Sequence, residues 1–170
     1  HGDGQSLWCS CHADDVARAF VGACGNAVSF GKSYHVTGEE FLTWNQHHET
    51  VARAIGAPVP RLVHIPTDVL AGLLPSETLA DAAHWTLTNF QFNNVFDNSA
   101  AKRDLGFRHT VRWEDGAARL VAWLNAHNAI ADSDLDHFDD SLIAAWEAMR
   151  SNLAASWTRP TLVRPAEKKR

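Results

Sequence analysis

Strand-like segments are scarce in this chain, and their scarcity limits the folds that it can adopt. Residues 33–36 and 62–65 are short and β-prone, and residues 90–96 alternate aromatic and polar side chains. Three short strands are too few for a self-sufficient sheet in an α/β domain of 170 residues. We therefore expect these strands to complete a sheet that begins elsewhere.

Helical patterns account for most of the remaining sequence. The segments that we expect to be helical are 12–24, 43–55, 66–74, 77–86, 97–105, 110–124 and 142–153. Asp14 or Asp15 is expected to cap the first helix, and Thr110 is expected to cap the sixth. Thr43 and Gln46 have the spacing of a capping box at the start of the second helix.

Apolar stripes on these helices predict which faces are buried. The stripes are Ala17, Phe20, Val21 and Cys24; Val51, Ala52 and Ile55; Trp113, Ala117, Leu120, Val121 and Leu124; and Ile143, Trp146 and Met149. The stripe that begins at Trp113 is the longest, and we expect it to form core.

Composition excludes several classes of protein. The net charge is -5 at pH 7 and the only clustered basic residues, 168–170, end the chain, so no nucleic-acid partner is expected. No apolar run approaches the ~18 residues of a membrane helix, and no signal segment starts the sequence. Three cysteines are an odd number, which argues against a disulfide framework. We expect a soluble, cytoplasmic protein and, because residue 1 is His, a fragment or a processed product.

Six motifs follow one another in an order typical of one enzyme family. They are Gly2-Asp-Gly4, His12 to Phe20 (HADDVARAF), Gly31 to Gly38 (GKSYHVTG), Thr43-Trp44, Asp97 to Phe107 (DNSAAKRDLGF) and Trp113 to Gly116 (WEDG). Over about residues 2–126 the chain resembles the C-terminal half of an extended short-chain dehydrogenase/reductase, of the NAD-dependent epimerase/dehydratase family. The resemblance implies an α/β fold class: the C-terminal lobe of a Rossmann-type enzyme, mostly helical with a few short strands, without its N-terminal dinucleotide-binding half.

The catalytic motifs of that family are missing from this chain. In the family, the N-terminal half carries a Gly-x-x-Gly-x-x-Gly turn for the dinucleotide and a Tyr-x-x-x-Lys pair for acid–base chemistry. Here Gly22 and Gly25 are followed by Val28, and Tyr34 has Gly38 four positions later. The resemblance therefore implies that NAD or NADP is bound mainly by the missing half. We assign no catalytic, cofactor-binding or metal-binding residue to this chain.

A departure from the family pattern bears on the substrate. Relatives that act on nucleotide sugars commonly carry an arginine six residues after the start of the Gly-Asp-Gly motif, followed by Asp and Tyr. This chain has Trp8, Cys9 and Ser10 at those places. Because a guanidinium grips pyrophosphate, its absence favours a less charged carbonyl or alcohol substrate over a nucleotide sugar.

Three residues are candidates for substrate binding: Trp8, His12 and Arg103. Each has a structural role as its alternative. Trp8 is either a pocket wall or an ordinary core or surface aromatic. His12 and Asp15 either border the substrate or have structural roles, in which Asp15 caps the helix and His12 packs or bonds locally. Arg103 either positions a polar substrate group or is a solvated helix charge.

A zinc-dependent hydrolase is a third reading of the sequence, because Cys9, Cys11 and His12 are followed by the pair His47 and His48. Structural zinc sites favour Cys pairs separated by two to four residues, whereas a single residue separates these two. We therefore predict no metal.

The motifs also suggest how the chain is divided. We expect a substrate-binding lobe at 1–127, an acidic connector and C-terminal helix at 128–157, and a loose basic tail at 158–170. The expected function is the substrate-binding portion of an NAD(P)-dependent oxidoreductase, epimerase or dehydratase, inactive without its Rossmann half. Its partners would be a small-molecule substrate and either a complementary Rossmann half or a second copy of the chain. The alternative is a non-catalytic binding or assembly module, so whether the chain is itself an enzyme stays open.

Overall fold

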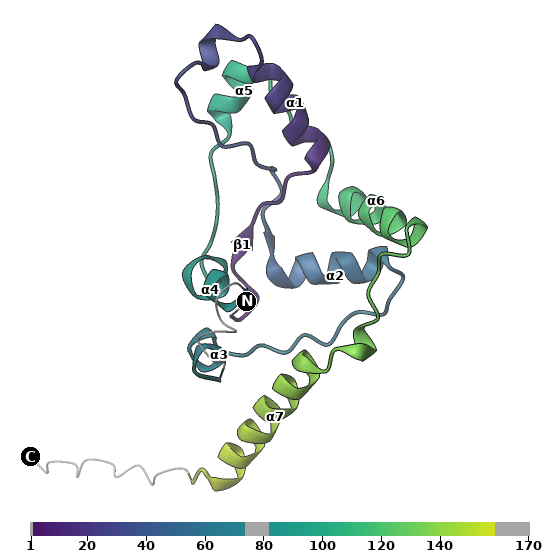
Figure 1. The fold of residues 1–170 in the computed structure, drawn as a ribbon. Helices are drawn as coiled ribbons and strands as arrows, with labels where there is room; N and C mark the ends of the chain where they lie inside the picture. The colour runs from purple at the N-terminus through teal and green to yellow at the C-terminus, as the bar shows by residue number, and fades with distance from the viewer. Residues whose placement is uncertain (1, 74–81, 159–170) are drawn as a thin grey trace, which may run out of the picture. The chain divides into compact units, whose positions relative to one another are not determined.

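The computed structural model describes residues 2–73 and 82–158 (Figure 1). The chain divides into two compact units, His1–Ile130 and Ala131–Arg170. Within the described residues the architecture is mostly helical, with one sheet of two strands. This agrees with the expectation of a helical lobe that carries few strands.

The helices of the first unit lie close to the positions that the sequence predicts. They are α1 (Ala13–Ala23), α2 (Trp44–Ala54), α3 (Thr67–Leu73), α4 (Ala82–Trp85), α5 (Ser99–Leu105) and α6 (Trp113–Ala126), with short turns η1 (Ala27–Ser29) and η2 (Thr86–Phe90). Residues 74–81 lie outside the described residues, and with them part of the helix predicted at 77–86. Its described end is α4, which widens into the π-helical turn η2.

The strands differ from the prediction. β1 (Leu7–Trp8) pairs antiparallel with β2 (Leu42–Thr43), and neither was predicted. The predicted strands at 33–36 and 62–65 form no ladder, and residues 90–96 begin inside η2 instead of in a strand. The segment after η2 nevertheless runs along β1, because the Asn94 amide donates to the Leu7 carbonyl oxygen at 2.8 Å and the Asn93 side chain accepts from the Leu7 amide.

The predicted capping box of α2 is confirmed. The Thr43 hydroxyl accepts from the Gln46 amide at 3.2 Å, and the Gln46 side-chain oxygen accepts from the Thr43 amide at 2.8 Å. Two donors at the start of the helix are thus satisfied reciprocally.

The predicted caps of α1 and α6 are wrong. The side chain that caps α1 is that of His12, whose Nδ1 accepts from the Asp14 amide at 3.1 Å. At α6 the Glu40 carboxylate accepts from the Trp113 amide at 2.6 Å, and Thr110 makes no capping bond. His12 and Glu40 accept the hydrogen bonds at the starts of these two helices. Asp15 and Thr110 do not, because they are hydrogen-bonded to each other.

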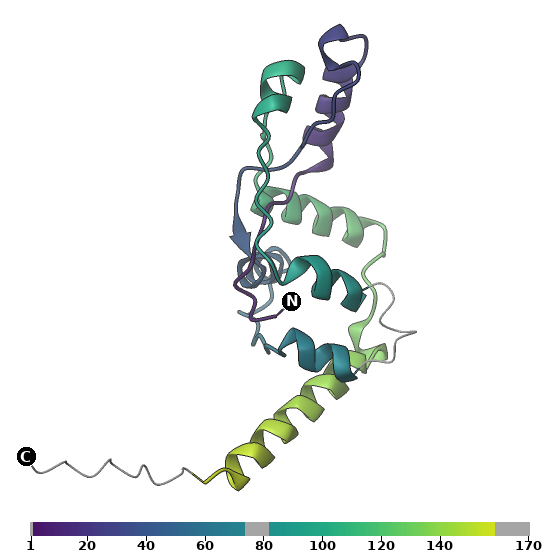
Figure 2. The same cartoon turned by 90° about the vertical axis from the view of Figure 1, so that its left-hand side faces the viewer.

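The buried face of α1 is also not the one predicted. Phe20 and Val21 are 71 % and 73 % exposed, whereas Asp15 and Ala19 are buried. Ala19 joins Ala101 and Phe107 in a small core where α1 lies beside α5 (Figures 1 and 2). Small side chains allow this close approach, since a Cβ at Gly22 would overlap the Leu105 carbonyl oxygen. A prediction from hydrophobicity alone favours burial of the face with Phe20 and Val21 over the face with Asp15 and Ala19.

The contact between α2 and α6 buries polar side chains. Of the predicted α2 stripe, Ala52 is buried but Val51 and Ile55 are exposed. His47 and Thr50 are buried beside Ala52. On α6, Ala117 is buried as predicted, Leu120 is exposed, and the other members of the stripe are half-buried.

The second unit consists of η3 (Ser133–Leu135) and α7 (Phe138–Ser156). α7 contains the predicted helix at 142–153 and extends it at both ends, with Asp139 and Asp140 in its first turn. Of its predicted stripe, Ile143 and Trp146 are half-buried and Met149 is exposed. The predicted loose tail falls almost wholly on residues 159–170, outside the described residues.

Among the residues that the structure describes, no helix is both long and apolar enough to cross a lipid bilayer.

Candidate functional site

An aromatic cluster joins β1, α2 and η2. Trp8 stacks on Trp44 with their ring centroids 5.7 Å apart, and the edge of Phe90 contacts both, at 5.3 and 5.0 Å. The Trp44 indole N–H also donates to the Phe90 carbonyl oxygen at 3.0 Å. Edge-to-face and offset stacking of this kind adds to the stability that burial provides. Trp8 of β1 therefore packs against side chains from α2 and η2.

Trp8 also lines an open groove of about 710 Å³, here named the β1 groove. Its wall is made by the end of β1 and the segments around residues 34–37 and 96. The lining residues are Trp8, Cys9, Ser10, Cys11, Tyr34, His35, Val36, Thr37, Phe96 and Trp113. None of these is Asp, Glu, Lys or Arg, so the described lining presents aromatic, apolar and neutral polar groups.

Contacts between polar groups hold the floor of the β1 groove. The Cys9 thiol and the Thr37 hydroxyl are hydrogen-bonded at 2.8 Å, and Asn98 donates to the Thr37 carbonyl oxygen at 3.0 Å. Gly38 fits against the chain after β1, since a Cβ there would overlap the Ser10 carbonyl oxygen. The segment at Thr37 and Gly38 therefore packs closely against the residues that follow β1.

The Cys11 thiol at this site is a poor nucleophile. Burial, reinforced by the negative charge of Asp15 and by Cys9, raises the pKa of Cys11 to about 11. A thiol with such a pKa stays protonated at neutral pH and does not attack electrophiles readily.

His12 lies in a second cavity of about 370 Å³, here named the α6 cavity. The residues on the His12 side are Ser10 to Ala13, and those on the α6 side include Val111, Arg112, Trp113, Gly116, Arg119, Leu120 and Trp123. His12 Nδ1 is engaged in capping α1. Ser10, Cys11 and Trp113 line both hollows, so the structure brings Trp8 and His12 to neighbouring sites rather than to one.

Arg103 lies apart from both hollows. Its side chain is 67 % exposed on α5, and its Nε donates to the carboxylate of Asp104 at 2.7 Å. Lys32 and the Tyr34 hydroxyl bind the same carboxylate, each at 3.0 Å. Hydrogen bonds from Arg103, then from Lys32, hold the pKa of Asp104 well below its usual range. The structure therefore places Arg103 in a charge cluster and not in the lining of either site.

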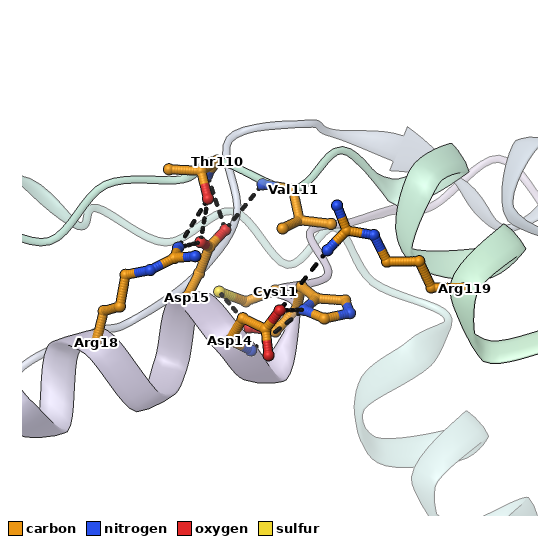
Figure 3. Close-up of polar contacts among 8 residues, drawn as sticks. Cys11, Asp14, Asp15, Arg18, Thr110, Val111 and Arg119 are labelled. Atoms are coloured by element: carbon orange, nitrogen blue, oxygen red, sulfur yellow. Dashed lines mark hydrogen bonds and ion pairs between the residues drawn. The ribbon is translucent and has the colours of Figure 1, made fainter. Parts of the chain in front are cut away.

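Asp15 anchors the loop before α6, as Figure 3 shows. Its fully buried carboxylate accepts from the amides of Thr110 and Val111, at 2.8 and 3.1 Å, and from the Thr110 hydroxyl. Arg18 also pairs with it. Burial raises the pKa of Asp15, but these hydrogen bonds and Arg18 outweigh burial and lower the pKa to about 2. Asp15 is a positioning residue that fixes one wall of the α6 cavity.

Neither His47 nor Trp113 was predicted to border a substrate site, since the sequence indicated Trp113 as core and His47 only as a possible zinc ligand. His47 is buried, its ring lies edge-on to Trp113 at 4.6 Å, and its Nε2 is 3.4 Å from the Trp8 carbonyl oxygen. Burial lowers the pKa of His47, which favours the neutral ring. Residues 47, 50 and 54 share one helical face, but their side chains, His, Thr and Ala, include no large apolar group that would mark this face as buried.

Among residues 2–73 and 82–158, no group of three His, Cys, Asp or Glu side chains is placed to hold a metal ion. The zinc-hydrolase reading therefore gains no support from the described geometry.

Comparison with known proteins found no matching family model and no matching curated protein.

Proposed function

We propose that this chain is the substrate-binding lobe of an extended short-chain dehydrogenase/reductase of the epimerase/dehydratase family. The reaction would be hydride transfer on a neutral carbonyl or alcohol substrate. The proposal rests on the ordered motifs of the sequence and on the β1 groove, where Trp8 is the residue that we assign to the substrate.

The observation that carries the proposal is the chemistry of the β1 groove. An aromatic and apolar wall with a few hydroxyl and imidazole groups suits a neutral organic substrate. A pyrophosphate would call for a cation, and no Lys or Arg lines the described groove. The groove thus supports a substrate other than a nucleotide sugar.

The segments that border the groove favour a second domain that packs against this chain. Residues 33–36 carry a strand-like sequence but form no ladder in the described structure, and the segment after η2 makes one backbone bond to β1. Several large apolar side chains of the first unit are exposed: Phe20, Val21, Phe30, Phe41, Val59 and Val95. Unpartnered backbone and apolar surface of this extent favour association with another domain.

Gly22 and Gly25 do not form a dinucleotide-binding turn in the described structure. A phosphate-binding turn needs glycines at the N-terminus of a helix. Gly22 lies inside α1 near its C-terminal end, against the Leu105 carbonyl, and Gly25 follows that helix. We therefore assign NAD or NADP to the complementary half.

This chain would contribute positioning and shielding of the substrate. The rings of Trp8, Phe96 and Trp113 would exclude water from it. The hydroxyl of Ser10, in the groove wall, is available to donate a hydrogen bond to a substrate oxygen. Cys9, Cys11 and Cys24 are free thiols, and we place the protein in the reducing cytoplasm.

The test begins with the reading frame that contains this chain. The codons before His1 should encode a Gly-x-x-Gly-x-x-Gly turn and a Tyr-x-x-x-Lys pair. The longer protein should oxidise NADPH or NADH in a panel of aldehydes and ketones. Trp8→Ala should lower kcat/KM by about tenfold or more while the affinity for the nucleotide stays unchanged. A reading frame without those motifs would exclude the proposal.

A non-catalytic assembly module is the second candidate, and the exposed apolar side chains favour it equally. Sedimentation and amide hydrogen exchange of the 170-residue chain separate the two. An enzyme half deprived of its partner should exchange rapidly or aggregate, whereas an independent module should be protected and keep a defined oligomeric state.

A further inference from the structure

The α6 cavity combines an apolar interior with positive charge at its edge. Trp113, Leu120 and Trp123 supply apolar and aromatic surface on the α6 side. The charged residues of the lining are Arg112 and Arg119, and no Asp or Glu belongs to the described lining. A cavity of about 370 Å³ is within the size range of small-molecule sites.

The two arginines are not equally free. Arg112 Nε donates to Glu40 at 3.2 Å, and the same carboxylate binds the Trp113 amide. Arg119 is 59 % exposed, and its partner among the described residues is Asp14, at 3.6 Å. This separation is longer than a hydrogen bond, and Asp14 also faces His12 at 3.5 Å. The guanidinium of Arg119 therefore has N–H groups that can donate to a further anionic partner.

Gly116 gives α6 its close approach to His12. A Cβ at this position would lie 3.2 Å from the Cδ2 atom of His12, tighter than ordinary contact. Glycine is unfavourable inside a helix, and the space beside His12 gives a reason for it here.

From this arrangement we propose that the α6 cavity binds a planar aromatic carboxylate, with its ring beside Trp113 and Trp123 and its carboxylate on Arg119. This site adjoins the substrate site assigned to the β1 groove and shares Ser10, Cys11 and Trp113 with it, but Arg119 lines the α6 cavity and not the groove. It is formed by residues of this chain and needs no nucleotide. Its failure and that of the proposed function are therefore distinguishable.

The test is a titration with 2-naphthoate, with uncharged 2-naphthamide as the matched probe. Tryptophan fluorescence should saturate with one equivalent of 2-naphthoate, and the amide should bind at least about tenfold more weakly, because a charge-assisted bond is lost. Equal affinity for the two probes, or no saturable binding of either, would overturn the proposal. The titration is run on the chain and on the protein encoded by the longest reading frame that contains it, and the sample that is folded decides the outcome.

Variants locate the site. Arg119→Met should abolish the preference for the carboxylate, while Arg150→Met, on α7, should leave it unchanged. Gly116→Ala should weaken binding by about fivefold or more without lowering the Tm, because alanine favours the helix but intrudes beside His12. Retention of the preference in Arg119→Met would contradict the assignment of the anion to this residue.

Discussion

The carboxylate of Asp15 accepts hydrogen bonds from both the backbone amide and the hydroxyl of Thr110, a residue 95 positions further along the chain. This pair ties the start of α1 to the loop that enters α6, and so fixes the spacing of the two walls of the α6 cavity. Among the described residues, the fully buried apolar cluster beside α1 is small and consists of Ala19, Ala101 and Phe107, so the Asp15 contacts add to a limited local core.

Asp15→Asn should destabilise the first unit by about 3 kcal/mol, because an amide cannot satisfy the donors that the carboxylate satisfies and one of its own N–H groups is buried unpaired. Urea unfolding measures the loss. Asp14→Asn is the control: Asp14 is exposed, so its change should be within about 0.5 kcal/mol. Equal losses at the two positions would contradict the anchoring role of Asp15.

Stability should fall in acid. The pKa of Asp15 is lowered from 3.8 to about 2, so the folded form binds the proton less well than the unfolded form. The contribution is therefore fully present above about pH 4 and is lost as the pH falls toward 2. Unfolding free energies across this range should show a shallower slope in Asp15→Asn. Asp104, whose pKa is also lowered, should account for part of the remaining slope.

Removing the cap of α2 should cost a predictable amount. Thr43→Ala should lower the free energy of unfolding by about 1 kcal/mol, because the Gln46 amide loses its acceptor. Thr43→Ser keeps the hydroxyl and should lose a few tenths at most. If serine and alanine behaved alike, the capping box would have no part in the stability of α2.

The three cysteines should react at different rates with a thiol reagent at pH 8. Cys24 is exposed and should react at once, whereas Cys9 is buried and Cys11, with a pKa of about 11, is almost wholly protonated. One fast equivalent is therefore expected, and Cys24→Ser should abolish it. A fast phase that survives in Cys24→Ser would show that the loop after β1 opens readily.

Local signals predicted the helices well. The Thr43 capping box forms as the sequence indicates, and α5 (Ser99–Leu105) lies within the helix predicted at 97–105. Each depends on contacts within a few residues, which spacing encodes directly.

Hydrogen bonds between residues far apart in the chain could not be predicted from the sequence. The roles of Asp15, Thr110 and Glu40 depend on contacts across 73 to 95 residues, which no local pattern encodes. The strand predictions were wrong for a related reason. A strand requires a neighbouring strand, and the segment at 33–36 pairs with none in the described structure. Of the three candidate substrate residues, Trp8 and His12 line hollows, and Arg103 lies in a charge cluster.

We propose that this chain forms the wall of a substrate pocket and that another domain binds the nucleotide. Titration of NADH and NADPH into the 170-residue chain, followed by fluorescence, tests it most directly. We expect no saturable binding of either nucleotide to the chain alone, and stoichiometric binding to the longer protein that carries the Gly-x-x-Gly-x-x-Gly turn. Tight one-to-one binding of either nucleotide to the isolated chain would contradict it.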